Sequence, residues 1–410
     1  MLPTPEYARN LRLVGFSDQG GRPDGVQLMV VDGFAYVAHM FSQGFSVIDV
    51  RDPANPKPGA YIPCPANTWS LHLQAAEDLL LVVNAKDLYR DELTMDEKSY
   101  YVGSMADKLA GSERDYAAGV RVYDISDRPN PREIGFLALE GVGAHRLWWT
   151  GGRWAYVSAM LDGFSDYIFL TLDMADPTTP TVAGRWWIPG MNTAAGETPS
   201  WDDQAFRYSC HHGIVSGDTA YVTWRDGGVT LLDVTDRGKP ELIAHCNWSP
   251  PFGGGTHNAL PLPGRELMVV VDEAVMERQA DGVKPIWIFD IREPSNPVSI
   301  ATMPIPDEAD YLAKGSRFGP HNVHENRPGT WVSETEIFAT YNNAGVRVYD
   351  ISDPFRPVET AAFVPAAPAR LMDDRPGVPQ ISAAGDVFVD AQGLLYTTDQ
   401  NGGLSILERT

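Results

Sequence analysis

Residues 120–136, VRVYDISDRPNPREIGF, contain the pattern that decides the fold. Their first half alternates in polarity and is rich in β-branched side chains, which is typical of a β-strand. The Asp, Pro and Asn residues that follow favour a tight turn, and a second short strand comes after them. Similar segments lie at 45–61, 168–186, 229–245, 286–302 and 346–363. Six copies in one chain predict a repeat architecture.

A further pair of apolar strands precedes these segments, as in residues 144–160, AHRLWWTGGRWAYVSAM. Each unit then has four antiparallel strands, and such units repeated around an axis are the blades of a β-propeller. The last unit, residues 386–408, has only three strands, and residues 10–16 match the missing outer strand. We expect residues 10–16 to pair with 403–407, closing the ring. The sequence predicts one all-β domain over 1–410, a seven-bladed β-propeller closed by an N-terminal strand.

The units resemble the LVIVD repeat family, whose name reflects strands such as FSVIDV (45–50) and VRVYDI (120–125). The resemblance covers nearly the whole chain and implies a propeller scaffold. It implies no particular activity, because a fold does not define a function.

Charge and composition exclude several classes of partner. A formal charge of -22 and a pI near 4.7 disfavour binding to nucleic acid or to anionic membranes. The N-terminus lacks the pattern of an export signal, and no apolar stretch reaches membrane-spanning length, so we expect a cytoplasmic protein. The three cysteines show no CxxC spacing, which argues against a disulfide framework or a thiolate zinc site. The sequence is compatible with a homo-oligomer.

Long insertions fall in the two loop classes that open on one face of a propeller. They are residues 85–119, 161–166, 190–209, 272–284, 307–319 and 365–384. We expect them to form a lid on that face, with 85–119 folding as a small helical cap because it is rich in helix formers and i,i+4 charge pairs. Lids of this kind commonly cover a binding or reaction site.

Histidines recur where the innermost strands begin, which is on the lidded face. Successive units place there His145, His211, His257 and His321, with His72 in the second unit in a register uncertain by about one residue. Imidazoles gathered on a propeller axis suit a transition metal better than Mg or Ca. The pattern predicts one metal ion per chain, with Fe(II) favoured and Mn, Zn or Cu as alternatives. The competing interpretation is that each histidine bonds a backbone carbonyl or water.

Neighbouring residues suggest supporting roles. The pairs His257-Asn258 and His321-Asn322 lead us to expect the asparagines to point away from the channel, since alternate strand positions face opposite sides. Carboxylates that could orient the imidazoles are available in the lid loops. These are Glu197, Asp202, Glu273, Glu308 and Asp310.

The lid is also rich in aromatic residues and arginine, which suits a small, aromatic or partly apolar substrate. Arg207, Tyr208 and Arg317 are the expected polar contacts because their loops lead to His211 and His321. His212 and His324 are further candidates for substrate contacts or catalysis.

The histidine arrangement is similar to that of the carotenoid-cleaving oxygenases, in which four axial histidines hold iron, although no sequence motif is shared. We therefore expect a metal-dependent enzyme, foremost a non-haem iron oxygenase. A metal-dependent lyase or isomerase and a non-catalytic protein-interaction propeller are the alternatives.

Overall fold

The computed structural model describes residues 2–90 and 97–410. Three four-stranded antiparallel sheets follow the chain order from the inner to the outer strand. The first contains β3 (Gly25–Val31), β4 (Phe34–His39), β5 (Gly44–Asp49) and β6 (Lys57–Pro63). The second contains β16 (Gly213–Ser216), β17 (Thr219–Thr223), β18 (Val229–Asp233) and β19 (Glu241–Cys246). The third contains β20 (Thr256–Leu262), β21 (Leu267–Asp272), β22 (Ile286–Asp290) and β23 (Val298–Thr302).

A nine-stranded sheet contains two such series that meet at the single pair Gly143↔Ala85. One series is β8 (Leu73–Ala76), β9 (Leu79–Lys86), β10 (Gly119–Asp124) and β11 (Arg132–Ala138), and β7 (Thr68–Trp69) also pairs with β9. The other is β12 (Gly141–Trp148), β13 (Trp154–Leu161), β14 (Ile168–Asp173) and β15 (Thr181–Trp186).

The two remaining sheets each receive a strand from the N-terminal segment. One contains β24 (Glu336–Thr340), β25 (Val346–Asp350) and β26 (Val358–Val364), with β1 (Tyr7–Arg9) added beside β26. The other contains β27 (Ala384–Val389), β28 (Leu395–Asp399) and β29 (Gly403–Arg409), with β2 (Leu11–Ser17) beside β29. The pairing of β1 was not expected from the sequence.

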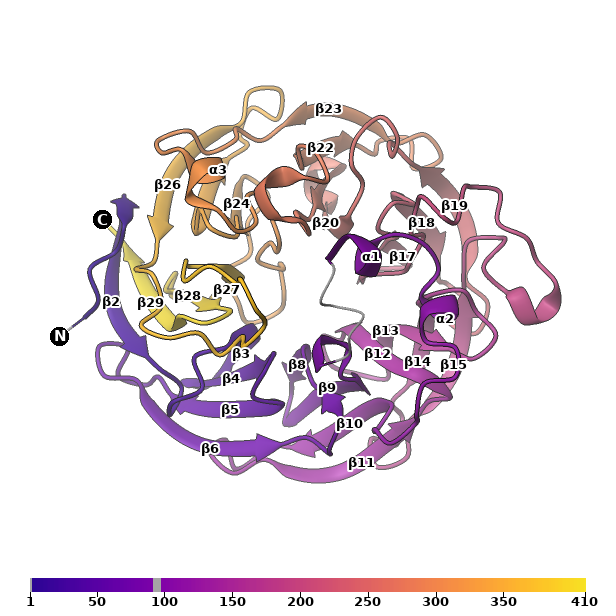
Figure 1. Ribbon diagram of the computed structural model, residues 1–410, viewed down its shortest axis with the longest axis horizontal. Helices are drawn as coiled ribbons and strands as arrows, with labels where there is room; N and C mark the ends of the chain where they lie inside the picture. Colours follow the sequence, from indigo (N-terminus) through magenta and orange to yellow (C-terminus); the bar gives the residue numbers. More distant parts are fainter. Residues whose placement is uncertain (1, 91–96) are drawn as a thin grey trace.

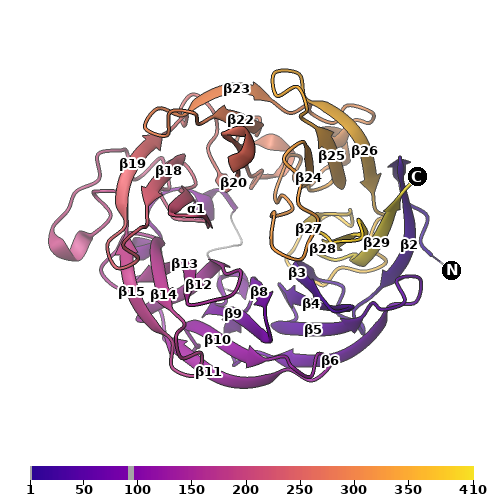
Figure 2. The same ribbon diagram turned by 180° about the vertical axis from the view of Figure 1, so that it is seen from behind.

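The sheets lie side by side around a common centre and follow one another in chain order (Figure 1). The view from behind shows the same ring (Figure 2). This arrangement is a β-propeller. The core lies between adjacent sheets, where aromatic residues from neighbouring sheets interlock. Phe45 and Tyr123 meet edge to face with ring centroids 5.2 Å apart, and Trp186 and Trp224 do so at 5.3 Å.

Glycines in outer strands allow close approach of the neighbouring sheet. A Cβ atom on these glycines would overlap a backbone oxygen in the turn of the next repeat. The contacts would be 1.8 Å for Gly15 and Pro53, 2.5 Å for Gly135 and Pro177, and 2.4 Å for Gly184 and Arg237.

Short helices occupy the insertions: η1 (Leu88–Arg90), α1 (Glu97–Tyr101), α2 (Met105–Lys108) and α3 (Tyr311–Lys314). Within 85–119, where a helical cap is expected, residues 91–96 lie outside the described residues. Tyr100 and Met105 are buried and pack into the main core cluster, so α1 and α2 are anchored to the propeller. None of the helices in the described part of the chain has the length and hydrophobicity of a membrane-spanning segment.

Candidate metal centre

The innermost strands begin with a hydrogen-bond pattern that repeats from sheet to sheet. In the sheets that show it, the hydroxyl of a Ser or Thr on the second strand accepts a hydrogen bond from a backbone N–H near the start of the inner strand. The pairs are Arg146 with Ser158, His212 with Thr223, Asn322 with Thr340 and Asp386 with Thr398. The residue before each N–H donor is called the entry position here. Entry positions are thus His145, His211, His321 and Gly385.

The same hydroxyls also contact the next sheet. They donate to the carbonyl oxygens of His211, His257, Gly385 and Val26. This second bond identifies His257 and Val26 as the entry positions of their own inner strands. Four consecutive entry positions along the ring therefore carry histidine, which is the set that the sequence pattern predicts.

The four entry histidines form a continuous row. Centroid distances are 4.8 Å from His145 to His211, 3.9 Å from His211 to His257, and 4.6 Å from His257 to His321. The Nε2 atoms of His145 and His211 lie 3.0 Å apart. The structure thus brings together side chains that four different sheets supply.

Three of these imidazoles are oriented by a hydrogen bond at Nδ1. His211 donates to the carbonyl oxygen of His257 (3.1 Å), and His321 donates to that of Gly385 (2.6 Å). His257 donates to the side-chain oxygen of Asn258. A neutral imidazole that donates through Nδ1 keeps a lone pair on Nε2, which is the state of a metal ligand.

The environment keeps these imidazoles neutral. Burial, followed by the positive charge of neighbouring arginines, lowers the pKa of His145, His211 and His257 well below the usual value. Burial likewise lowers the pKa of His321 to about 4, although Glu273 acts in the opposite direction.

Glu273 lies against the row of histidines. Its two carboxylate oxygens are 3.6 Å from Nε2 of His257 and 3.7 Å from Nε2 of His321, and it forms an ion pair with Arg225. Burial alone would raise the pKa of Glu273, but Arg225 and its other neighbours lower it below the usual value. His211, His257 and Glu273 offer ligand atoms within 4.8 Å of one another, so this group could hold a metal ion.

A cavity of about 50 Å³ adjoins these groups. Its polar lining includes the four entry histidines together with Glu273, Arg146, Arg225 and Arg317. Its aromatic lining includes Trp69, Tyr89, Tyr100 and Tyr101. The arginines and the carboxylate give a formal charge of +2 (three positive, one negative) in a chain of net charge -22.

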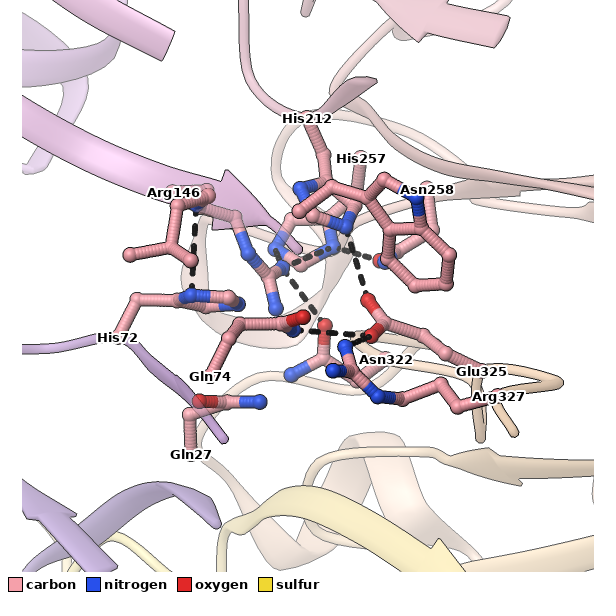
Figure 3. A network of polar contacts seen from close by, with 12 residues as sticks. Gln27, His72, Gln74, Arg146, His212, His257, Asn258, Asn322, Glu325 and Arg327 are labelled. Atoms are coloured by element: carbon pink, nitrogen blue, oxygen red, sulfur yellow. Dashed lines mark hydrogen bonds and ion pairs between the residues drawn. The ribbon is translucent and has the colours of Figure 1, made fainter. Parts of the chain in front are cut away.

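A second group of ligand-type residues lies further along the inner strands (Figure 3). His72, His212 and Glu325 are buried, and their ligand atoms also lie within 4.8 Å of one another. Nε2 of His212 and the Glu325 carboxylate are 2.8 Å apart. Gln74 donates to the other carboxylate oxygen at 3.1 Å, and Arg327 lies 3.6 Å from it. This group could also hold a metal ion.

His72 does not occupy an entry position. Its Nδ1 accepts the backbone N–H of Leu147 in the next inner strand at 3.4 Å. Gln27 and Asp386 accept the corresponding N–H groups of Leu73 and Leu28. His72 is therefore equivalent to Gln27 and Asp386 of other repeats, one residue after the entry position. Leu71 occupies the entry position of this repeat. The one-residue uncertainty in the register is resolved in this way.

Asn322 does not point away from the channel, which differs from the expectation based on strand alternation. Asn322 lines the cavity, and its Oδ1 accepts a bond from Arg146 at 2.8 Å (Figure 3). The pairing register shifts between Ala144 and Arg146 and between Thr256 and Asn258. A bulge at the entry position lets two successive side chains reach the channel.

Several predicted contact residues are engaged elsewhere. Arg207 is buried in an ion pair with Asp166 (2.7 Å), and Tyr208 stacks on Trp201 with centroids 4.2 Å apart. Neither lines the cavity beside the histidines. His324 donates to the carbonyl oxygen of Trp331 (2.8 Å) and accepts from the N–H of Val389 (3.1 Å), so both its nitrogens link neighbouring segments. Arg317 lines the cavity.

Arg146 and Glu325 were not predicted from the sequence. Nη1 of Arg146 lies 3.2 Å from both ring nitrogens of His257 and is buried between the two groups of histidines (Figure 3). Both residues could have been noticed by their position, since Arg146 follows an entry histidine and Glu325 lies four residues after another.

Comparisons with known proteins agree with this fold. Residues 24–57 and 214–247 match the LVIVD repeat. The chain is similar to the β-propeller domain of Cps50 (Swd1) from Myceliophteria thermophila, with 11% identity, a TM-score of 0.56, and coverage of 94% of this chain and 97% of that one. The chain is also similar to U3-55K, with 10% identity, a TM-score of 0.57, and coverage of 98% of this chain and 99% of that one. A third similar structure is that of a hypothetical selenium-binding protein from Sulfolobus tokodaii, with 13% identity, a TM-score of 0.54, and coverage of 92% of this chain and 91% of that one.

These similarities concern the fold, since the identities are low. The chain is a β-propeller that carries LVIVD repeats. No curated protein sequence matches it.

Proposed function

We propose that the chain binds one transition metal ion through Nε2 of His145, His211, His257 and His321, and that it acts there on a small organic molecule. The observation that carries this proposal is the Nδ1 hydrogen bond of His211, His257 and His321, which places the lone pair of each neutral ring on Nε2. Imidazole ligands suit Fe, Zn or Cu, and Fe(II) remains the favoured ion.

The spacing of the first two histidines fits one ion. Two nitrogen ligands about 2.1 Å from a metal and 3.0 Å from each other subtend about 90° at the ion. Such an angle suits a five- or six-coordinate centre, in which positions remain for substrate or O2. A bound Fe(II) would supply oxygen activation, and a bound Zn(II) would supply polarisation of a substrate oxygen.

Residues around the proposed metal ion would support it in two ways, by balancing its charge and by covering the cavity. Glu273 balances part of the charge and contacts His257 and His321, while Arg225 holds Glu273 in place. Tyr100 and Tyr101 of α1 cover the cavity and limit its access to water. Its volume of about 50 Å³ admits a substrate head group of only a few non-hydrogen atoms.

We also propose that the ring has seven blades. The two series in the nine-stranded sheet count as separate blades because only the Gly143↔Ala85 pair joins them. In the blade of β24–β26, the inner strand is the irregular segment around Val323, which bridges to Ala339. The pairing of β2 with β29 supports the closure of the last blade by the N-terminal segment.

The alternatives differ in what they require of the entry histidines. A metal-dependent lyase or isomerase would use the same centre and turn over without oxygen. A protein-interaction propeller would require no metal. The row of four neighbouring imidazoles, three of them buried and oriented through Nδ1, favours the metal-dependent functions.

Titration of chelator-treated protein with Co²⁺ tests the proposal. We expect a visible absorption band that saturates at about one equivalent and disappears in a His211→Ala, His257→Ala double variant. His245→Ala is the matched control, because this histidine is exposed and bonds the Gly227 carbonyl oxygen at 2.7 Å, away from the entry histidines. No Co²⁺ band in folded wild-type protein would contradict the proposal. Oxygen uptake with candidate substrates then separates an oxygenase from a lyase or isomerase.

A further inference from the structure

A second, larger cavity lies beside the metal cavity. It has a volume of about 160 Å³, and both cavities are lined by Tyr101 and Arg225. The shared lining makes these two side chains the boundary between an outer chamber and the proposed metal centre. The outer chamber is lined by residues of α1 and of the loops 190–209, 247–255 and 272–284, which include Phe206, Phe252, Val275 and Met276.

The lysine and arginine side chains that line the outer chamber mostly bond carbonyl or carboxylate oxygens of the protein itself. Lys284 donates to the carbonyl oxygens of Gly253 (2.6 Å) and Gly254 (3.0 Å) and lies 3.1 Å from Asp281. Arg207 is paired with Asp166. What the chamber offers to a ligand is therefore mainly the apolar and aromatic surface of Phe206, Phe252, Val275 and Met276.

The boundary carries two arginines. The guanidinium carbons of Arg225 and Arg317 each lie 5.8 Å from the ring centroid of Tyr101. Arg225 forms an ion pair with Glu273, which itself faces His257. Arg146 and Arg225 against Glu273 leave one excess positive charge among these three groups of the metal cavity, and a bound dication would increase it. An anionic group would be attracted to this boundary.

We propose that the substrate is a small carboxylate with an apolar body about the size of one aromatic ring. Its carboxylate would lie at Arg225, beside the metal centre, and its apolar body would occupy the outer chamber. The size follows from the chamber, because a cavity of about 150 Å³ accommodates benzene. This inference rests on the proposed function where it takes the metal as the reacting centre. The binding of the carboxylate at Arg225 does not depend on it.

Benzoate, formate and benzamide are suitable probes. Benzoate has both the charge and the ring, formate has only the charge, and benzamide has only the ring. Isothermal calorimetry with Co²⁺-loaded protein should show benzoate binding at least about tenfold more tightly than either of the others, a difference of about 1.4 kcal/mol. An Arg225→Gln variant should lose most of the affinity for benzoate and for formate.

The variant Ala205→Trp tests the outer chamber, because Ala205 is an exposed residue on its lining. We expect about tenfold weaker benzoate binding, with formate binding and metal content unchanged. Ala195→Trp is the matched control, since Ala195 is also exposed but does not line the chamber.

Benzoate and formate binding with equal affinity would overturn the inference, and so would an Ala205→Trp variant that binds benzoate like the wild type. Both results leave the metal proposal intact. Conversely, if no Co²⁺ binds but metal-free protein still binds benzoate with the same dependence on Arg225 and Ala205, the inference stands and the proposed metal function fails.

Discussion

The Nε2 atoms of His145 and His211 lie 3.0 Å apart, although 66 residues separate them in the chain. They begin the inner strands of neighbouring repeats, and the repeat geometry alone brings them together. Since His211 also donates through Nδ1, its Nε2 has a lone pair directed toward His145. A metal ion bound by both nitrogens would replace the direct contact between the two rings.

Glu273→Gln should weaken metal binding by about 10- to 100-fold, because the carboxylate that contacts two ligand histidines and balances charge is lost. Competition with a chromogenic chelator measures the effect. Glu277→Gln is the control, since Glu277 is exposed in the same loop. Equal affinities for the two variants would show that Glu273 does not support the site.

Arg207→Ala should destabilise the protein by about 3–5 kcal/mol, because Asp166 would remain buried without its ionic partner. Urea unfolding measures this change. Adding Asp166→Asn should restore part of the lost stability, since the uncompensated charge is removed. A stable Arg207→Ala variant with altered ligand binding would instead support the substrate contact predicted from the sequence.

Stability of the metal-free protein should fall as the pH is lowered from about 6.5 to 4, in part because of His324. Burial lowers the pKa of this histidine to about 4 in the folded protein, whereas the unfolded chain takes up a proton near pH 6.5. The unfolded state then binds more protons in this window, which costs about 3 kcal/mol of stability. Asp386, whose pKa burial raises to about 7, acts in the opposite direction over the same range.

Urea unfolding of wild type and His324→Gln at pH 7 and 4.5, with chelator present, isolates the contribution of this histidine. We expect the variant to lose clearly less stability than the wild type between these pH values. The same loss in both proteins would contradict the assignment.

Gly184→Ala should cost about 1–3 kcal/mol, because the new Cβ would lie 2.4 Å from the backbone oxygen of Arg237 and force neighbouring repeats apart. Arg185→Ala, on the same strand, is exposed and should change stability by less than about 0.5 kcal/mol. Thermal unfolding followed by circular dichroism compares the two. Similar melting temperatures would argue against tight packing between these repeats.

The sequence was sufficient to predict the propeller because each repeat carries its own strand and turn signals. Because the last repeat lacks a strand, the sequence predicts that residues 10–16 supply it, and in the structure Leu11–Ser17 pairs with β29. The pairing of Tyr7–Arg9 with β26 was not, because a three-residue strand has too short a pattern.

The entry histidines could be predicted from their spacing in the repeats. The directions in which the neighbouring side chains point could not, because they depend on the bulge at the entry position. The alternation rule fails at Asn322, whose side chain bonds Arg146, and His72 lies one residue after the entry position. The ion pair of Arg207 with Asp166 depends on how two lid loops meet, which local sequence does not encode.

Elemental analysis of protein purified without a metal-affinity tag is the most direct test of the central claim. The proposal predicts about one transition metal ion per chain in the wild type, in His245→Ala and in His72→Ala, and almost none in the folded His211→Ala, His257→Ala double variant. Metal that persists in the double variant but is lost in His72→Ala would place the ion with His212 and Glu325 instead. Wild-type protein that contains no metal and binds none after reconstitution would contradict the proposal.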